Sequence, residues 1–296
     1  MGNQGRDSVL VTGGAGSLGL ETALTLAARG FRVFAGVRDP AQEAGIRDAA
    51  RQRGVAVDTV RLDLTDEASI AEAIRSIVDA SGHLYGVVNN AGINLRGYFE
   101  DLDEAEIRDV FEVNVFGTMR VARHALPHLR GARRGRIVIM SSVAGRIGSM
   151  GLTAYVASKF ALEGFAESLS LEVEPLGIRV AIIEPGIVQT SIWGKNRRIA
   201  PRALDPARPY YEWFRCVEQE ADKLVRSSKL TPGAVAAGVA RALTDRNPRL
   251  RYTIGRRASL VVALRRHLPG ELFERLYFGE VLRRVTGRRG FAGPSH

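Results

Sequence analysis

A glycine-rich loop between a short apolar run and a helix-like segment constrains the fold of this chain most strongly. Residues Ser8–Thr12 have the pattern of a buried strand, the loop Gly13-Gly14-Ala15-Gly16-Ser17-Leu18-Gly19 follows, and Leu20–Ala28 has helical apolar spacing. Glycines permit a tight turn and a close backbone approach, and a helix start offers N–H groups to an anion. This order predicts a dinucleotide pyrophosphate site, with a ligand-free glycine turn as the alternative.

The alternation of strand-like and helix-like segments continues along the chain. Such alternation is typical of an α/β fold in which helices cover both faces of a parallel sheet. We expect a doubly wound sheet with a C-terminal helical extension, in a single domain over 1–296. The predicted strands are Ser8–Thr12, Arg32–Gly36, Thr59–Leu62, Leu84–Asn89, Arg136–Ser141 and Arg179–Glu184, and the predicted helices are Glu21–Arg29, Gln42–Arg53, Ser69–Ala80, Glu104–Leu129 (continuous or interrupted) and Tyr155–Glu174.

Tyr155 and Lys159 stand four residues apart, which places a phenol beside an ammonium on one face of a helix. A free tyrosine has a pKa of about 10 and is a poor acid or base near neutral pH. A nearby cation favours the phenolate, whereas burial opposes it. We expect a net fall in the pKa of Tyr155 that suits general acid/base catalysis. A solvated surface pair is the alternative.

Polar residues also follow two predicted strands. Asn89-Asn90-Ala91-Gly92 ends one strand, and Ser141-Ser142 ends another, thirteen residues before Tyr155. Ligands of open α/β sheets bind at the carboxyl ends of strands, where a hydroxyl can contact a carbonyl oxygen. Each motif alone is also compatible with simple turn chemistry.

Together these features resemble the short-chain dehydrogenase/reductase family, in particular its single-domain, hydroxysteroid- and retinol-dehydrogenase-like members. The resemblance implies a Rossmann fold and hydride transfer with a nicotinamide cofactor. It covers roughly residues 8–190 and rests on Thr12-Gly13, Gly16, Gly19, Asn89-Asn90-Ala91-Gly92, Asn114, Ser142, Tyr155, Lys159, Pro185-Gly186 and Thr190.

The resemblance also implies a catalytic set. Tyr155 would be the general acid/base, and Lys159 would lower its pKa and hold the nicotinamide ribose. Ser142 would orient the substrate oxygen, and Asn114 would hold a water in a proton relay. The cofactor would contact Gly13, Gly14, Gly16, Ser17, Leu18, Gly19, Arg38, Asp63, Leu64, Asn90, Ala91, Gly92, Tyr155, Lys159, Pro185, Gly186, Val188 and Thr190.

The glycine loop departs from the single-domain pattern Thr-Gly-x-x-x-Gly-x-Gly. Ser17 stands at the middle glycine position, and a glycine occurs one place earlier, at Gly16. That spacing is typical of the extended branch of the family, which includes epimerases and dehydratases. It leaves the loop geometry open and makes an epimerase or dehydratase one alternative; a non-catalytic, cofactor-binding regulatory or scaffold protein is another.

The end of the second strand favours NADP(H) over NAD(H). Val37 fills a position that is acidic in NAD-preferring relatives, and Arg38 follows it. An acidic residue there binds the ribose hydroxyls, whereas a basic one suits the 2′-phosphate. The alternative is that Asp39 binds the ribose and Arg38 is a surface residue.

Substrate selection is expected in a variable loop over about residues 187–230. Trp193 and four further aromatic residues lie there, and Ser142 and Tyr155 would also contact the substrate. Aromatic side chains suit bulky apolar ligands, so we expect a steroid-, retinoid- or lipid-like alcohol, ketone or aldehyde; core packing is the alternative. The other aromatics are Tyr210, Tyr211, Trp213 and Phe214, and the opposite wall would contain Ile147, Met150 and Leu152.

The region from about residue 257 to 296 is basic and helix-like. Leu272, Phe273, Leu276 and Leu282 would form its apolar face, with Arg275, Arg283 and Arg284 opposite. Packing against the domain is the favoured interpretation, and weak peripheral membrane contact is the alternative. The net charge of +10 could suit anionic partners, but no nucleic-acid motif is present.

The remaining features point to an intracellular enzyme. Cys216 is the single cysteine, and the N-terminus lacks a signal-peptide core, so we expect a cytoplasmic protein. His124 and His128 lack a third ligand, so no metal site is expected. The family resemblance suggests a homodimer or homotetramer through the helices that carry Asn114 and Tyr155.

Overall fold

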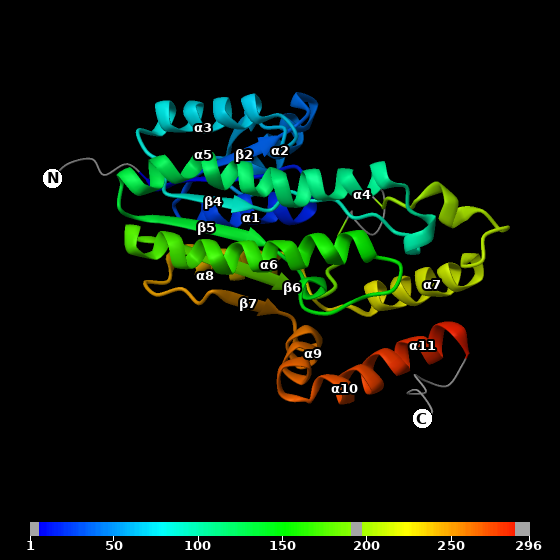
Figure 1. The fold of residues 1–296 in the computed structure, drawn as a ribbon. Coiled ribbons are helices and arrows are strands. Elements are labelled where there is room, and N and C mark those ends of the chain that lie inside the picture. The colour runs from blue at the N-terminus through cyan, green and yellow to red at the C-terminus, as the bar shows by residue number, and fades with distance from the viewer. Residues whose placement is uncertain (1–5, 191–196, 288–296) are drawn as a thin grey trace.

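A parallel sheet forms the centre of the computed structural model, which describes residues 6–190 and 197–287. Within these residues the sheet has seven strands in the order β3-β2-β1-β4-β5-β6-β7 (Figure 1). The expected doubly wound α/β fold is thereby confirmed. The strands are β1 (Ser8–Val11), β2 (Arg32–Val37), β3 (Asp58–Arg61), β4 (Gly86–Asn89), β5 (Gly135–Met140), β6 (Ile178–Pro185) and β7 (Arg251–Ile254).

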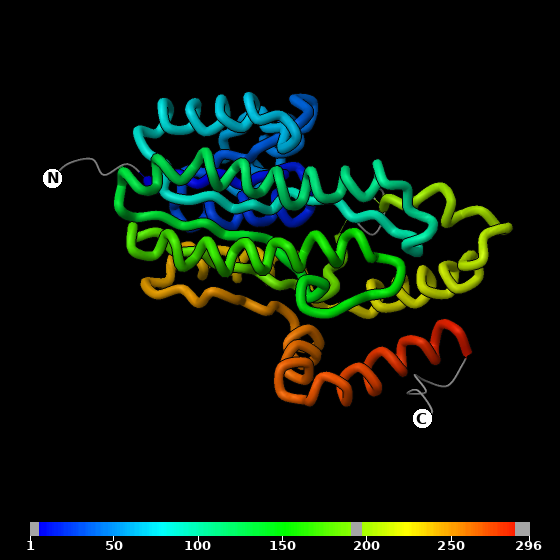
Figure 2. The backbone as a smooth tube through the Cα atoms, viewed as in Figure 1, coloured from blue at the N-terminus to red at the C-terminus, as the bar shows by residue number. Residues whose placement is uncertain are grey.

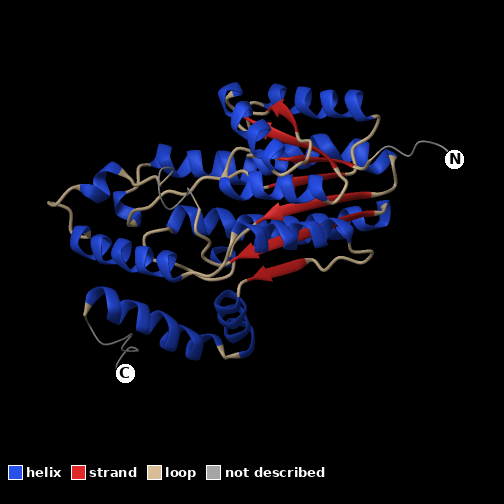
Figure 3. Cartoon of the chain, turned by 180° about the vertical axis from the view of Figure 1, so that it is seen from behind, coloured by secondary structure: helices blue, strands red, loops and turns tan. Residues whose placement is uncertain are grey.

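Helices cover both faces of the sheet, which is why the central strands are almost continuously apolar. In β1, Val9 and Val11 face one core layer and Leu10 faces the other. Figures 1 and 3 show the two faces from opposite sides. One face carries α1 (Ser17–Ala28), α2 (Glu43–Gln52) and α8 (Pro232–Thr244), and the other carries α3 (Glu67–Ser81), α5 (Thr118–Gly131) and α6 (Thr153–Val173).

The order in which strands are added to the sheet reverses at β1, which pairs in parallel with β2 on one side and β4 on the other. In open α/β sheets, ligands bind at such a switch point, outside the carboxyl ends of the strands. The glycine loop follows β1 and the Asn90 turn follows β4, so both motifs lie at this edge. The fold thus brings the two predicted cofactor segments together.

The predicted long helix is interrupted, as anticipated. α4 (Glu104–Phe111) leads into a π-helical segment, Glu112–Gly117, which continues as α5. π-bulges inside helices are frequent at functional sites, and this one carries Asn114. Short 3₁₀ turns occur at Pro40–Gln42, Phe99–Asp101, Val143–Gly145, Glu174–Leu176 and Pro201–Leu204.

The C-terminal helices pack beside the sheet domain. After α7 (Tyr211–Ser227), the tail forms α9 (Arg256–His267), α10 (Gly270–Phe273), a π-helical turn and α11 (Gly279–Thr286), and α11 contacts α7 (Figure 2). Phe273 is buried and stacks on Tyr277 with ring centroids 5.2 Å apart. The contact between α11 and α7 supports packing of the tail on the domain.

One detail of the predicted tail is wrong. Leu276 is 57% exposed, so it does not share a buried face with Phe273. The reason is the π-helical turn Glu274–Phe278, whose wider turn rotates the side chains relative to an α-helix. Across the described residues, the structure contains no helix with the length and hydrophobicity to cross a membrane.

Candidate active site

The glycine loop is shaped by close backbone contacts. Gly13 has a φ of +65°, which favours glycine, and the Gly14 N–H donates to Gly36 O over 2.9 Å. A Cβ at Gly14 would lie 2.6 Å from the Ala35 Cβ. A Cβ at Gly19 would overlap Gly13 O and lie 2.7 Å from the Asn90 Nδ2. Gly14 and Gly19 are therefore required by the packing of the loop itself.

Gly16 has a different environment. It is the N-cap of α1 with φ −74° and ψ 156°, a conformation open to any residue, and no side chain caps the helix. A Cβ at Gly16 would meet only Gly13 O, at 3.3 Å. The glycine at this position leaves the start of α1 uncovered, so its backbone N–H groups can face an anion. The sequence therefore departs from the single-domain pattern in the position of one glycine, but the start of α1 is still not covered by a side chain.

Asn90 braces the two sides of the switch point. Its Nδ2 donates to Thr12 O over 2.9 Å, and its backbone N–H donates to the Thr12 Oγ1 over 3.0 Å. The Ala91 N–H donates to the same hydroxyl over 2.9 Å. These bonds fix the turn after β4 against the end of β1. Asn90 and Ala91 therefore shape the cofactor edge of the sheet.

Asn114 lies in the π-helical segment and is fully buried. Its Oδ1 accepts from the Ile93 N–H over 2.8 Å, and its Nδ2 donates to Ile93 O over 2.9 Å. The same Nδ2 donates to the Ser158 Oγ over 3.0 Å. A Cβ added at Gly92 would lie 3.1 Å from the Asn114 Oδ1 and 3.8 Å from the Lys159 Nζ. Asn114 and Lys159 thus meet beside Gly92.

Tyr155, Lys159 and Ser142 converge at the carboxyl end of β5. The buried Lys159 ammonium donates to Met140 O over 2.7 Å and lies 5.6 Å from the Tyr155 ring centroid. Burial lowers the pKa of Lys159 to about 8, although Glu163 opposes this shift. Burial raises the pKa of Tyr155, and a hydrogen bond with Ser142 acts in the opposite direction.

The expected net fall in the pKa of Tyr155 is therefore wrong for the protein without bound cofactor, in which the pKa is raised. The sequence argument weighed the charge of Lys159 against burial and gave the charge more weight. In the structure, the Lys159 ammonium is engaged by Met140 O, and burial is the larger influence on the pKa of the phenol.

Arg38, Asp39 and Asp63 lie beyond the ends of β2 and β3. Arg38 is exposed, and Asp39 accepts from the Ala41 N–H over 2.9 Å as the cap of a 3₁₀ turn. Burial raises the pKa of Asp63, but hydrogen bonds from Thr65 and the charge of Arg38 outweigh it, so that the pKa is lowered. Asp39 is thus engaged by its own backbone, while Arg38 lies close enough to act on Asp63.

The other predicted cofactor residues border the same edge. Pro185 ends β6, and the Gly186 N–H donates to Ile254 O over 2.9 Å. Leu64 packs against Gly117, where an added Cβ would lie 2.7 Å from the Leu64 Cβ. Val188 is buried, whereas Ser17, Leu18 and Thr190 are partly exposed.

The predicted substrate residues come from the variable loop and from the segment between Ser142 and Tyr155. Trp193 lies outside the described residues. Phe214 is 1% exposed and belongs to a third apolar cluster, so it is a core residue. Tyr210 stacks on Tyr98 with centroids 5.0 Å apart. Ile147 and Leu152 are buried on the segment between Ser142 and Tyr155, and Met150 is partly buried.

Several polar residues were missed in the sequence. Arg96 is 1% exposed and pairs with Glu218 over 2.5 Å, which ties the segment after β4 to α7. Glu163, Glu184 and Arg251 form a second buried network behind Lys159. Each pairing joins residues far apart in sequence, so no local motif could have revealed it.

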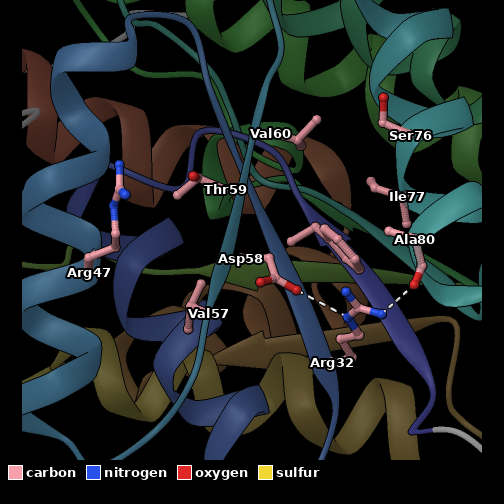
Figure 4. Close-up of a pocket in the computed structure, with 10 residues that line it drawn as sticks. Arg32, Arg47, Val57, Asp58, Thr59, Val60, Ser76, Ile77 and Ala80 are labelled. Atoms are coloured by element: carbon pink, nitrogen blue, oxygen red, sulfur yellow. Dashed lines mark hydrogen bonds and ion pairs between the residues drawn. The ribbon is translucent and has the colours of Figure 1, made fainter.

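Two cavities are lined by none of Tyr155, Lys159 and Ser142, although Arg251 lines one of them. One of about 430 Å³ is lined by Arg32, Asp58, Ala80 and neighbouring side chains (Figure 4). Arg32 pairs there with Asp58 over 3.1 Å and donates to Ala80 O over 2.6 Å. Because Arg32 and Asp58 begin β2 and β3, this cavity is at the amino edge of the sheet, opposite the edge where such folds bind ligands. The other, of about 380 Å³, lies between β7 and α9.

Comparisons with known proteins agree with this geometry. The short chain dehydrogenase family model matches residues 7–200. The mitochondrial D-beta-hydroxybutyrate dehydrogenase of Bos taurus is 33% identical, over 92% of this chain and 84% of that protein. Retinol dehydrogenase 8 of Bos taurus is 32% identical, over 90% and 88%. A short chain dehydrogenase/reductase from Burkholderia phymatum in complex with NAD has a TM-score of 0.77 and 26% identity, over 90% and 95%.

Proposed function

Because the chain belongs to the short-chain dehydrogenase family of nicotinamide-dependent oxidoreductases, we propose that it transfers a hydride between NADP(H) and a hydrophobic alcohol, ketone or aldehyde. The observation that carries the proposal is the convergence of Tyr155, Lys159, Ser142 and Asn114 beside the glycine loop. Side chains from three separate segments meet there, at the carboxyl ends of β4 and β5.

The loop suits a dinucleotide. Gly13 and Gly19 fold it tightly, and the uncapped start of α1 offers backbone N–H groups to a pyrophosphate. Gly16 places no side chain over that start. These features support Gly13, Gly14, Gly16, Ser17, Leu18 and Gly19 as the pyrophosphate segment, Asn90, Ala91, Gly92, Pro185, Gly186, Val188 and Thr190 as the nicotinamide side, and Asp63 and Leu64 as the adenine side.

Side chains of the protein would transfer the proton to and from the substrate. A bound nicotinamide supplies or accepts the hydride. Tyr155 would give a proton to the substrate oxygen in reduction and take it in oxidation, and Ser142 would hold that oxygen by a hydrogen bond. Lys159 would stabilise the phenolate that forms when Tyr155 loses its proton. Asn114 would fix the π-helical turn beside Lys159 and, through its remaining acceptor capacity, hold a water.

The preference for NADP(H) is supported by Arg38. Its guanidinium is exposed at the end of β2, while the neighbouring carboxylate of Asp39 caps a turn. Arginine presents several donors in a planar fork that matches a phosphate. Arg38 would therefore bind the 2′-phosphate.

The substrate class rests on the segment between Ser142 and Tyr155. Ile147 and Leu152 are apolar and buried there, and Met150 is partly buried, so this side favours an apolar ligand. The two curated relatives do not decide the matter, since one is named for a small hydroxy acid and the other for retinol at similar identity.

The experiment is a turnover panel. NADPH oxidation and NADP reduction would be measured with ketones, aldehydes and alcohols, from sugars and hydroxy acids to retinoids and steroids. We expect turnover of the apolar members, and loss of at least about 100-fold in Tyr155→Phe with cofactor binding kept. Activity confined to sugars or hydroxy acids would overturn the substrate class, and a Tyr155→Phe variant with full activity would overturn the mechanism.

A homodimer or homotetramer is the proposed assembly. Phe116 on the π-helical segment and Phe160 and Leu171 on α6 are 49%, 47% and 73% exposed. Exposed apolar side chains on helices that also carry the site suit a self-interface. Sedimentation of the wild type and of Phe160→Glu tests this; a monomeric wild type would contradict it.

A further inference from the structure

The helix that carries Lys159 also presents two carboxylates to the last strand. Glu163 lies one turn beyond Lys159 and is 6% exposed, and Glu167 lies a further turn away at the surface. Arg251 of β7 pairs with both, over 3.0 Å to Glu163 and 2.9 Å to Glu167. The two carboxylates thus share one guanidinium but differ in burial and in distance from Lys159.

A third carboxylate completes the cluster. Glu184 on β6 is fully buried, pairs with Arg146 over 2.9 Å and lies 3.6 Å from Arg251. The Thr253 hydroxyl donates to Glu184 over 2.6 Å. With Lys159, the cluster holds three cations and three carboxylates, so its charges balance.

Lys159 has no ion-pair partner within 4.0 Å among the described residues; its ammonium donates instead to Met140 O. Buried ammonium groups are strongly disfavoured unless a negative charge is near. Glu163 is the buried carboxylate one helical turn away, and its charge opposes the effect of burial on the pKa of Lys159. No other carboxylate acts on Lys159 in this way within the described part of the chain.

We propose that Glu163 is a positioning residue that keeps Lys159 protonated in the active site, with Arg251 holding the Glu163 carboxylate ionised. The proposal rests on the proposed function, because it assigns a purpose to the charge of Lys159 beside Tyr155. It gives β7 a part in the chemistry, through a side chain that touches none of the reacting atoms.

Several helices and strands contribute groups to the surroundings of Lys159 and Glu163. Lys159 faces Tyr155 on its own helix and Asn114 on the π-helical segment, and Met140 O on β5 accepts its hydrogen bond. Glu163 faces Arg251 and Glu184; Ser141, the residue after β5, also faces it, although the two side chains do not make a well-aligned hydrogen bond. Burial raises the pKa of Glu163, and Arg251 opposes the shift.

Removal of the Glu163 charge should therefore lower the pKa of Lys159 below about 8. Residues one helical turn apart have side chains separated by about 6 Å, and at an effective dielectric of 20 to 40 a unit charge at that distance shifts a pKa by about one to two units. Deprotonation of Lys159 would then begin near neutral pH. The alkaline limb of kcat/KM would move to lower pH by the same amount.

The test uses Glu163→Gln, with Glu167→Gln as the matched control. Glu167 shares Arg251 but is exposed and two turns from Lys159. The chain has four lysines, Lys159, Lys195, Lys223 and Lys229, so the side-chain carbon resonances of ¹³C-labelled lysine can be resolved by NMR and titrated in the cofactor-free protein. We expect a fall of about one to two units in the pKa of Lys159 in Glu163→Gln, and less than about 0.3 units in Glu167→Gln.

Glu163→Asp keeps the charge and should remain within about 0.5 units of the wild type. If it shifted the titration as far as Glu163→Gln, packing rather than charge would be responsible, and the proposal would fail. An unchanged Lys159 titration in folded Glu163→Gln would also overturn it. The titration needs no turnover, so a wild type inactive on every substrate would count against the proposed function without affecting this result.

Discussion

Replacing Gly19 with alanine should damage the fold rather than only the cofactor site. The added Cβ would overlap Gly13 O and approach the Asn90 Nδ2 within 2.7 Å. Gly13 is backbone held in a left-handed conformation, and Asn90 binds Thr12 across the switch point. Neither neighbour is the free end of a flexible side chain, so the turn itself would have to move.

The size of the effect follows from these contacts. Overpacking of a tight site costs about 1–3 kcal/mol, and loss of the Asn90 hydrogen bond to Thr12 adds about 1 kcal/mol. A loss of about 2–4 kcal/mol corresponds to a fall of roughly 3–6 °C in Tm for a protein of this size. The change should appear without any cofactor.

Gly16→Ala is the matched control, three residues away in the same loop. Its φ of −74° and ψ of 156° suit alanine, and its Cβ would meet only Gly13 O at 3.3 Å. We expect the free energy of unfolding to stay within about 0.5 kcal/mol of the wild type. Because the methyl group would cover the start of α1, NADPH affinity should fall at least about tenfold.

Calorimetry without cofactor and NADPH fluorescence titration separate the two effects. The wild type, Gly19→Ala and Gly16→Ala would be measured side by side. A Gly19→Ala protein that unfolds within about 1 °C (about 0.6 kcal/mol) of the wild type would show that the loop tolerates the added methyl group. Unchanged NADPH binding by Gly16→Ala would exclude a pyrophosphate at the start of α1.

Three further changes test other parts of the molecule. Arg38→Ala should weaken NADPH binding about tenfold and leave NADH binding unchanged in fluorescence titrations, because only the 2′-phosphate is lost. Arg96→Ala should cost about 1.5–3 kcal/mol in denaturant unfolding, since it removes a buried charged hydrogen bond and leaves Glu218 paired with Arg197 alone, whereas the exposed Arg202→Ala should cost less than about 0.5 kcal/mol. Phe273→Ala should cost about 3–5 kcal/mol and Leu276→Ala almost nothing, because only Phe273 is buried.

The sequence predicted most of the fold because its signals are local. The central strands are buried on both sides and therefore read as apolar runs, and six of the seven described strands were located within two residues. β7 was missed because it carries Arg251 and Thr253, whose polar side chains face buried carboxylates and interrupt the apolar pattern of a strand. The start of α1 was placed four residues late, because Gly19 inside the first turn hides a helix that begins at Ser17.

The candidate site shows the same division. Tyr155 and Lys159, or Asn89 and Asn90, form motifs because neighbouring positions must carry specific groups. The charges that act on the protonation of Lys159 come from elsewhere: Glu163 and Arg251 are 88 positions apart in sequence. A motif can therefore predict which groups take part in the chemistry, but not at what pH they do so.

The pKa of Tyr155 illustrates why this matters. The local argument gave Lys159 enough weight to lower it, whereas burial raises it in the folded chain. Burial lowers the pKa of Lys159 as well, so the same apolar surroundings weaken both the acid/base and its cationic partner. If the two act together near neutral pH, a further negative charge must keep Lys159 protonated, and β7 delivers the guanidinium that stabilises such a charge at Glu163. The edge strand β7, which the sequence did not predict, would thus help to determine the pH range in which Tyr155 and Lys159 act.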